Sequence, residues 1–74
     1  HYMLVFIKHG FKCKRLEVGP GGQITLVNVA VDVHDDVDIY GMFDFFTSAA
    51  HQVHVYSDGG MTVYTGGDCR LEQF

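Results

Sequence analysis

Alternation of apolar and polar residues is the strongest pattern in this chain, and it is clearest over residues 23–34, QITLVNVAVDVH. From residue 27 onward, one face of this segment is made of valine alone, at positions 27, 29, 31 and 33. The other face changes from apolar at Ile24 to polar at Asp32 and His34. A period of two predicts a β-strand. We therefore expect one face to lie in the core throughout, while the second becomes solvent-facing or functional halfway along.

The length of this predicted strand conflicts with the size of the chain. Twelve residues of strand extend about 40 Å, whereas a compact domain of 74 residues is only about 30 Å across. The strand therefore either bends sharply near residues 28–30 or pairs at its end with another chain. We favour the second alternative, a homodimer.

Further segments also read as strands. They are residues 2–8, 11–18, 52–57 and 61–65, and residues 69–73 alternate enough for a short edge strand. Residues 2–8 are apolar on both faces, which is typical of a strand that is covered on both sides or shared with a partner. A change of parity near Lys14-Arg15 predicts a bulge or bend in the second strand. The strongest turn is Gly19-Pro20-Gly21-Gly22, and Asp58-Gly59-Gly60 predicts a β-hairpin between the last two long segments.

Residues 36–51, DVDIYGMFDFFTSAAH, fit a helix better than a strand. The helical stripe at 39, 42, 43, 46, 49, 50 and 53 contains only apolar residues, and the opposite face is polar or Gly except for Phe45. Asp35, Asp36 and Asp38 suit the start of a helix, as N-cap and first-turn acids. Intrinsic propensity disagrees, because Val, Ile, Gly, Thr and Phe are mediocre helix formers.

These elements predict an α+β fold in one domain, residues 1–74. An antiparallel sheet of about five strands in the order β-β-β-α-β-β, with a possible short C-terminal strand, carries one helix packed on one face. The sequence shows no internal repeat, linker or low-complexity tract.

Composition supports a folded domain. Of the residues, 47% are hydrophobic and ten are Phe or Tyr, which excludes a disordered chain. No apolar run approaches the ~20 residues that span a bilayer, and nothing resembles a signal peptide. Met3 is a candidate natural start, which would make His1 and Tyr2 additional residues. We expect a cytoplasmic protein with Cys13 and Cys69 reduced, the alternative being one bridge between them.

Charge is strongly polarised along the chain. The net charge is −4, yet residues 1–16 contain four basic residues and no acid. Residues 17–74 contain Arg70 and nine acids. The basic segment gives an alternative function, nucleic-acid or phosphate binding, in which the cations track phosphates and an aromatic ring stacks on a base. The residues for this alternative are Lys8, Phe11, Lys12, Lys14 and Arg15.

The acidic segment contains the residues best suited to catalysis or metal binding. Asp32, His34 and the downstream His54 give a third candidate function, a metal-dependent or acid–base enzyme. Zinc requires three or four converging ligands at recognisable spacing, so His34, His51 and His54 are only weak metal candidates. We expect the aspartates to cap the helix, and we expect no enzyme activity, no metal and no cofactor.

These observations favour a small non-catalytic module that acts as an inhibitor or adaptor by contacting another protein, with no membrane partner. In size and composition alone, the chain is similar to phage-encoded inhibitors of host defence, including anti-CRISPR proteins. Interface cores are enriched in Tyr, Phe and Met, so the surface is expected to combine aromatic and acidic residues. The predicted partner-binding residues are Asp32, Asp35, Asp36, Asp38, Tyr40, Asp44, Phe45, Tyr56 and Tyr64.

Overall fold

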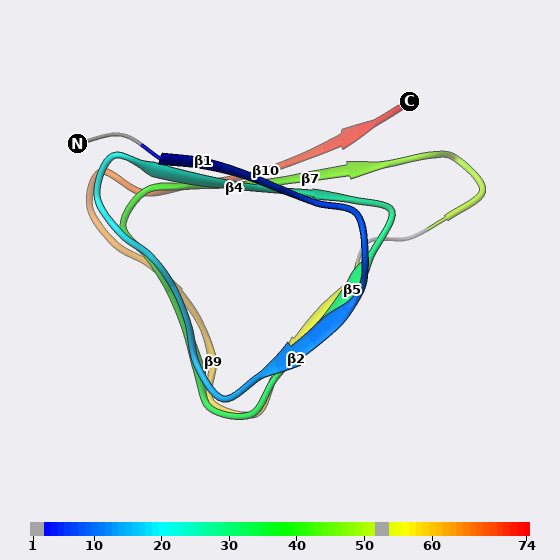
Figure 1. Ribbon diagram of the computed structural model, residues 1–74. Helices are drawn as coiled ribbons and strands as arrows, with labels where there is room; N and C mark the ends of the chain where they lie inside the picture. Colours follow the sequence, from blue (N-terminus) through cyan, green and yellow to red (C-terminus); the bar gives the residue numbers. More distant parts are fainter. Residues whose placement is uncertain (1–2, 52–53) are drawn as a thin grey trace.

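The computed structural model describes residues 3–51 and 54–74, and within them every regular element is a β-strand. The strands wind into a β-solenoid-like coil whose cross-section is triangular when viewed along its axis (Figure 1). Predictions that involve His1, Tyr2, Gln52 and Val53 lie outside the described residues. No helix long and apolar enough to cross a membrane occurs in the described part of the chain.

Each coil contributes one strand to each side of the triangle. The first coil contains β1 (Met3–Ile7), β2 (Phe11–Cys13) and β3 (Leu16–Val18). The second contains β4 (Gly22–Val27), β5 (Ala30–Val33) and β6 (Asp36–Ile39). The third contains β7 (Met42–Thr47), β8 (His54–Ser57) and β9 (Gly60–Val63), and β10 (Asp68–Gln73) continues the winding. Sheet A has the order β1-β4-β7-β10, sheet B the order β2-β5-β8 and sheet C the order β3-β6-β9.

Among the described residues, all strand pairs are parallel, and each strand pairs with its counterpart in the next coil. In sheet A, Met3 is paired with Gly22 and Gln23 with Met42, an offset of 19 residues in both cases. The next offset is 26 residues, from Met42 to Asp68, because the third coil has longer connections after β7 and after β9. The prediction of no internal repeat was therefore wrong at the level of structure, because the coils repeat without similar sequences.

Inward-facing side chains of successive coils stack on one another to form the core. Val31, for example, is fully buried and paired in register with Phe11 on one side and Val55 on the other. Burial of such a side chain stabilises the fold by about 1.5–3 kcal/mol. One coil cannot bury its own apolar face, so the stack is what makes the coils stable. The buried core consists of Val18, Leu26, Val29, Val31, Val33, Val37, Ile39 and Phe43.

Residues with special backbone or steric properties occupy the corners. Asn28, between β4 and β5, has a φ of 51°, a left-handed conformation that asparagine tolerates better than most residues. Gly41 is buried between β6 and β7, where an added Cβ would lie against the carbonyl oxygens of Gly22 and Gly19, the latter at 2.5 Å. The corners of successive coils therefore approach so closely that Gly41 has no room for a side chain.

The predicted α+β fold with an antiparallel sheet was wrong, and so was the helix over residues 36–51. That segment forms β6, a corner at Gly41, and β7. Val37 and Ile39 face inward from β6, and Phe43 faces inward from β7. The inward residues keep one parity through the corner at Gly41, but the step of four residues from Ile39 to Phe43 is also the spacing of a helical turn. Asp35, Asp36 and Asp38 therefore cap no helix.

The predicted hairpin around Asp58 was also wrong. The bend at Asp58-Gly59 joins β8 to β9, which belong to different sheets. β8 pairs with β5, and β9 pairs with β6, in both cases in parallel. The same residues suit a hairpin turn and a solenoid corner. The position of the turn was therefore predicted correctly, but the pairing of the strands on either side of it was not.

The segment 23–34 resolves the conflict between strand length and domain size by bending. Asn28 separates β4 from β5, and the longest extent of the molecule is 32 Å. The bend was one of our two alternatives, and it removes the reason for expecting a homodimer. Val29, Val31 and Val33 are buried, as predicted for the valine face. Val27 was predicted to share this face but is only partly buried and lies outside the core, because the backbone bends at Asn28.

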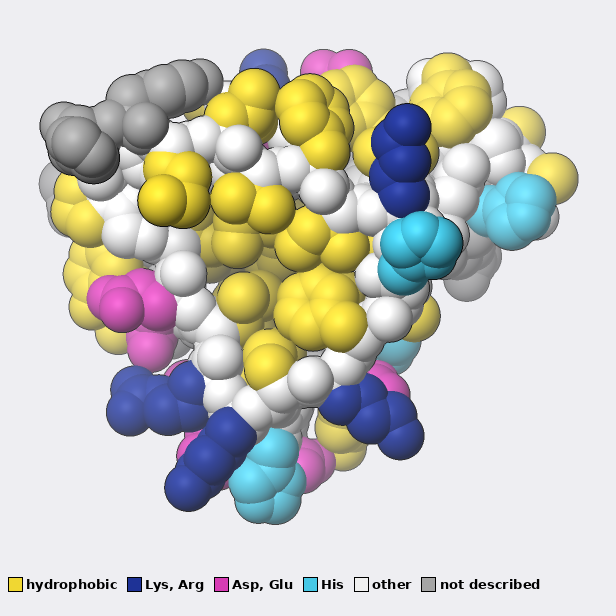
Figure 2. All heavy atoms as spheres, in the orientation of Figure 1, with side chains coloured by type: hydrophobic (Ala, Val, Ile, Leu, Met, Phe, Trp, Pro, Cys, Tyr) yellow, Lys and Arg dark blue, Asp and Glu magenta, His cyan; other side chains and the backbone are white. Residues whose placement is uncertain are grey.

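Figure 2 shows the end of the solenoid formed by the first coil, where apolar side chains fill the centre of the face and cations lie around its rim. β1 is exposed on both faces within the part of the chain that the structure describes. Val5 faces the interior stack, where it is paired with Ile24, yet remains 37% exposed. The outward-facing Phe6 is 62% exposed.

Candidate binding site

The structure divides the predicted partner-binding residues among different surfaces. Asp38 lies on the outer side of sheet C with Tyr40 and Tyr64 at its corner, whereas Asp44 lies on the outer side of sheet A. Phe45 packs against the core and contacts Phe43, with ring centroids 4.7 Å apart. The remaining members lie on sheet B and its corner with sheet C, namely Asp32, Asp35, Asp36 and Tyr56. The predicted set is therefore not one site, but three of its members do meet.

The surface where they meet is built from successive coils of sheet C, and we call it the tyrosine face: Arg15, Glu17, Asp38, Tyr40 and Tyr64. Tyr40 follows β6 and Tyr64 follows β9, so they occupy equivalent places in adjacent coils. Their rings are stacked, with centroids 4.2 Å apart and planes within 6° of parallel. Offset stacking of this kind adds about 0.5–1.5 kcal/mol in typical aromatic pairs.

Asp38 connects the two ends of this face. Its Oδ1 accepts a hydrogen bond from the Tyr64 hydroxyl at 3.0 Å, and its Oδ2 lies 3.7 Å from Arg15 Nη2. The hydrogen bond to the Asp38 carboxylate, together with Tyr40, raises the pKa of Tyr64 to about 12. Tyr64 therefore stays protonated and remains a hydrogen-bond donor well above neutral pH.

A cleft of about 460 Å³ adjoins Tyr40 on this face. Its lining is Arg15, Leu16, Glu17, Asp38 and Tyr40. Three of these residues come from the first coil, so the cleft lies on the side of Tyr40 away from Tyr64. Glu17 is the member that sequence reasoning missed. The available signal was its position between Leu16 and Val18, which marks it as the outward residue of a short strand.

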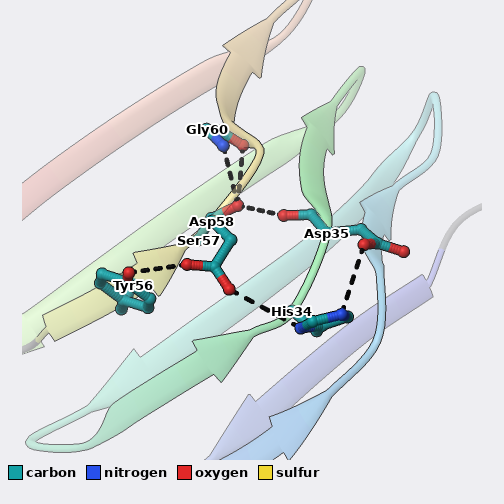
Figure 3. A network of polar contacts seen from close by, with 6 residues as sticks. All are labelled: His34, Asp35, Tyr56, Ser57, Asp58 and Gly60. Atoms are coloured by element: carbon teal, nitrogen blue, oxygen red, sulfur yellow. Dashed lines mark hydrogen bonds and ion pairs between the residues drawn. The ribbon is translucent and has the colours of Figure 1, made fainter.

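A second polar cluster lies at the corner between sheets B and C (Figure 3). His34 Nδ1 is 3.6 Å from Asp58 Oδ2, and His34 Nε2 is 3.9 Å from Asp35 Oδ1. The Tyr56 hydroxyl donates to Asp58 Oδ1 at 2.7 Å, which raises the pKa of Tyr56. Ser57 donates to the backbone carbonyl of Asp35 and accepts from Gly60 N at 3.1 Å. This network closes the corner, and its charged members are exposed.

The candidate enzyme and metal residues are distributed differently from the prediction. His54 is paired in register with Ala30, and Asp32 with Tyr56. His51 lies in the loop after β7, where its Nδ1 is 2.8 Å from Ser48 Oγ. Among the described residues, no three His, Cys, Asp or Glu side chains come together in a way that could hold a metal ion.

Asp44 has a structural role in sheet A. It is only 2% exposed although it faces outward from β7. Arg70 Nε donates to Oδ1 and Arg70 Nη2 to Oδ2, while Gln23 Nε2 donates to Oδ2. The hydrogen bonds from Arg70 are the main cause that lowers the pKa of Asp44. A carboxylate enclosed in this way is poorly available to a partner.

The residues of the nucleic-acid alternative belong to the first coil and its corners. Lys8, Lys12 and Lys14 are exposed, and Arg15 is engaged with Asp38. Phe11 packs against the core and is only partly exposed. Cys13 and Cys69 are free thiols in the structure, and burial raises the pKa of Cys69.

Comparison of the chain with protein-family models, with curated proteins and with solved structures gave no match.

Proposed function

We propose that this chain is a small non-catalytic module that binds a positively charged segment of a partner protein through the tyrosine face, in the manner of an inhibitor or adaptor. The observation that carries the proposal is the convergence of Asp38, Tyr40 and Tyr64, from two coils, with a cleft beside Asp38 and Tyr40. Glu17 adds a second carboxylate, paired in register with Asp38.

The chemistry of this face suits a cationic partner. Stacked tyrosine rings attract cations over their faces, and carboxylates form charge-assisted hydrogen bonds with Lys and Arg. Aromatic residues also provide the large, rigid contact area on which interface hot spots depend. A negatively charged segment would meet two carboxylates against one arginine on the same surface.

Fluorescence anisotropy with a dye-labelled peptide, in which Arg and Lys alternate with Gly and Ser, tests the proposal at low salt. We expect the chain to bind the peptide, and the double substitution Tyr40→Ala with Tyr64→Ala to weaken binding by roughly tenfold. Tyr56→Ala is the matched control, because Tyr56 is also an exposed tyrosine bonded to an aspartate but lies on sheet B.

Two outcomes would overturn the proposal. One is a peptide affinity that the double substitution leaves unchanged or that Tyr56→Ala reduces equally. The other is preferential binding of single-stranded DNA that depends on Lys8, Lys12 and Lys14, which would support the nucleic-acid alternative.

A further inference from the structure

The tyrosine stack stops one coil short of the end of sheet C. Val18, Ile39 and Val63 are paired in register across the three coils, and the residues that follow them are Gly19, Tyr40 and Tyr64. Tyr64 covers one face of the Tyr40 ring. In the first coil, the place of a third ring is taken by glycine, and a Cβ at Gly19 would meet no atom within 4 Å. There is space beside Tyr40 where the stack would continue.

The cleft already described is lined by Tyr40 and by Glu17, two residues before Gly19, and one of its walls is charged. Glu17 and Asp38 are register partners on adjacent strands, whose backbones lie about 4.8 Å apart. Asp38 is already engaged by Tyr64 and Arg15. Glu17 is exposed, and its carboxylate takes part in no hydrogen bond or ion pair with the other described residues. The cleft therefore offers one ring face and one unused carboxylate.

We propose that the space beside Tyr40 and Glu17, which we call the slot, accepts the guanidinium group of an arginine from the partner. The guanidinium would be stacked on Tyr40 and paired with Glu17. The inference rests on the proposed function and names the side chain that the cationic segment presents. A guanidinium is planar, stacks on aromatic faces and forms paired hydrogen bonds with a carboxylate. At the 4.2 Å spacing of the existing stack, it would lie level with the first coil, where Glu17 and Gly19 are found.

Other groups satisfy only part of this geometry. A lysine ammonium is a compact, strongly hydrated point charge, so it pairs with Glu17 without filling the flat slot. A nucleobase fills the slot and leaves Glu17 without a cation. A phosphate is repelled by Glu17 and Asp38, which outnumber Arg15.

Amide NMR titrations of the ¹⁵N-labelled chain, with N-acetyl-arginine methylamide, N-acetyl-lysine methylamide and adenosine as separate probes, test the inference. We expect the arginine probe to shift the amide signals of Glu17, Gly19 and Tyr40 and to bind several-fold more tightly than the lysine probe. Glu17→Gln should reduce this preference, whereas Glu72→Gln, which makes the same charge change at an exposed position on β10, should not.

Gly19→Phe provides a second variant, because its ring would fill the slot without altering any charge. We expect it to abolish the shifts caused by the arginine probe. If that variant does not fold, the inference is tested by comparing the effects of Glu17→Gln and Glu72→Gln on the preference for the arginine probe. Equal affinity for the arginine and lysine probes, a preference for adenosine, or arginine binding that survives Gly19→Phe would each overturn the inference.

The two proposals fail separately. Peptide binding that depends on Tyr40 and Tyr64 but shows no arginine preference overturns only the inference that the slot binds arginine. Arginine-probe binding at Glu17 and Tyr40, without any affinity for the basic peptide, overturns only the proposed function.

Discussion

Arg70 donates two hydrogen bonds to the carboxylate of Asp44, from Nε to Oδ1 at 2.9 Å and from Nη2 to Oδ2 at 3.2 Å. The two residues are register partners on the adjacent strands β10 and β7. The Asp44 side chain is almost completely enclosed, while that of Arg70 remains partly exposed. This paired interaction fastens the last strand of sheet A to the third coil on the outer side of the solenoid.

Asp44→Asn should destabilise the fold at neutral pH by about 1–3 kcal/mol, the usual cost of a mismatched buried polar group. The pKa of Asp44 is lowered in the folded chain, so its ionisation stabilises the fold above the unfolded pKa of about 3.9. This contribution is lost as the pH falls through the lower folded value. Urea unfolding of both proteins at several pH values should show a constant difference above about pH 5 that shrinks in acid.

Glu72→Gln is the control for this prediction, because Glu72 is an exposed acid on the same strand. Its effect should remain within about 0.5 kcal/mol. An Asp44→Asn difference that persists undiminished at the lowest pH would contradict the role given to the carboxylate.

Gly41→Ala should destabilise the fold by about 1–3 kcal/mol or more, the range typical of overpacked sites. The added methyl group would collide with backbone oxygens of the neighbouring corner, at Gly22 and Gly19, which cannot move without shifting the first coil. Urea unfolding followed by circular dichroism measures the loss. Gly19→Ala is the control, since its methyl group would meet nothing within 4 Å, and equal losses at both positions would refute the close approach of the corners.

Phe43→Ala should destabilise the chain by about 3–5 kcal/mol, as expected for removing a fully buried phenylalanine. Phe43 is 0% exposed and lies in the middle of the interior stack between Ile24 and Cys69. Since small domains have total stabilities of about 5–15 kcal/mol, thermal denaturation should show a large drop in Tm. Phe74→Ala, at a side chain that is 68% exposed, should leave Tm nearly unchanged; a similar drop there would contradict the assigned core.

Tyr64 should titrate with a pKa of about 12 because its hydroxyl donates to Asp38 and lies beside Tyr40. NMR of chains labelled with ¹³C at the tyrosine ζ carbon follows each phenol separately. At pH 11, the Tyr64 signal should still be that of the protonated form. Asp38→Asn should lower the pKa towards the ordinary value of about 10, whereas Asp58→Asn should lower only that of Tyr56. A normal Tyr64 titration in the unsubstituted chain would contradict the hydrogen bond.

Local features of the fold were readable from the sequence because they depend on neighbouring residues. Three of the four valines of the predicted face, Val29, Val31 and Val33, are buried, and the bend near Lys14-Arg15 separates β2 from β3. The Gly-rich turn ending at Gly22 separates β3 from β4, and Gly22 N donates to Gly19 O. Each of these depends on side-chain alternation or on backbone freedom within a few residues.

The tyrosine face was only partly predictable, because its residues come from different coils. Asp38, Tyr40 and Tyr64 were selected individually as acidic or aromatic surface residues, yet Tyr64 is 26 residues from the aspartate to which it donates. Glu17 joins them because β3 and β6 are paired. No local pattern brings these residues together, since their proximity depends on the register between coils.

The sequence by itself determined where this chain is extended, where it turns and which alternating positions are apolar. Only the tertiary structure decided which strands pair. An Asp-Gly-Gly bend suits a hairpin and a solenoid corner equally, and the inward residues Ile39 and Phe43 across the Gly41 corner have the spacing of a helix. Parallel pairing with strands 19 to 26 residues away is favoured only when all coils stack and bury a common interior. That gain in stability is cooperative and non-local, so it cannot be recognised in the sequence of any single segment.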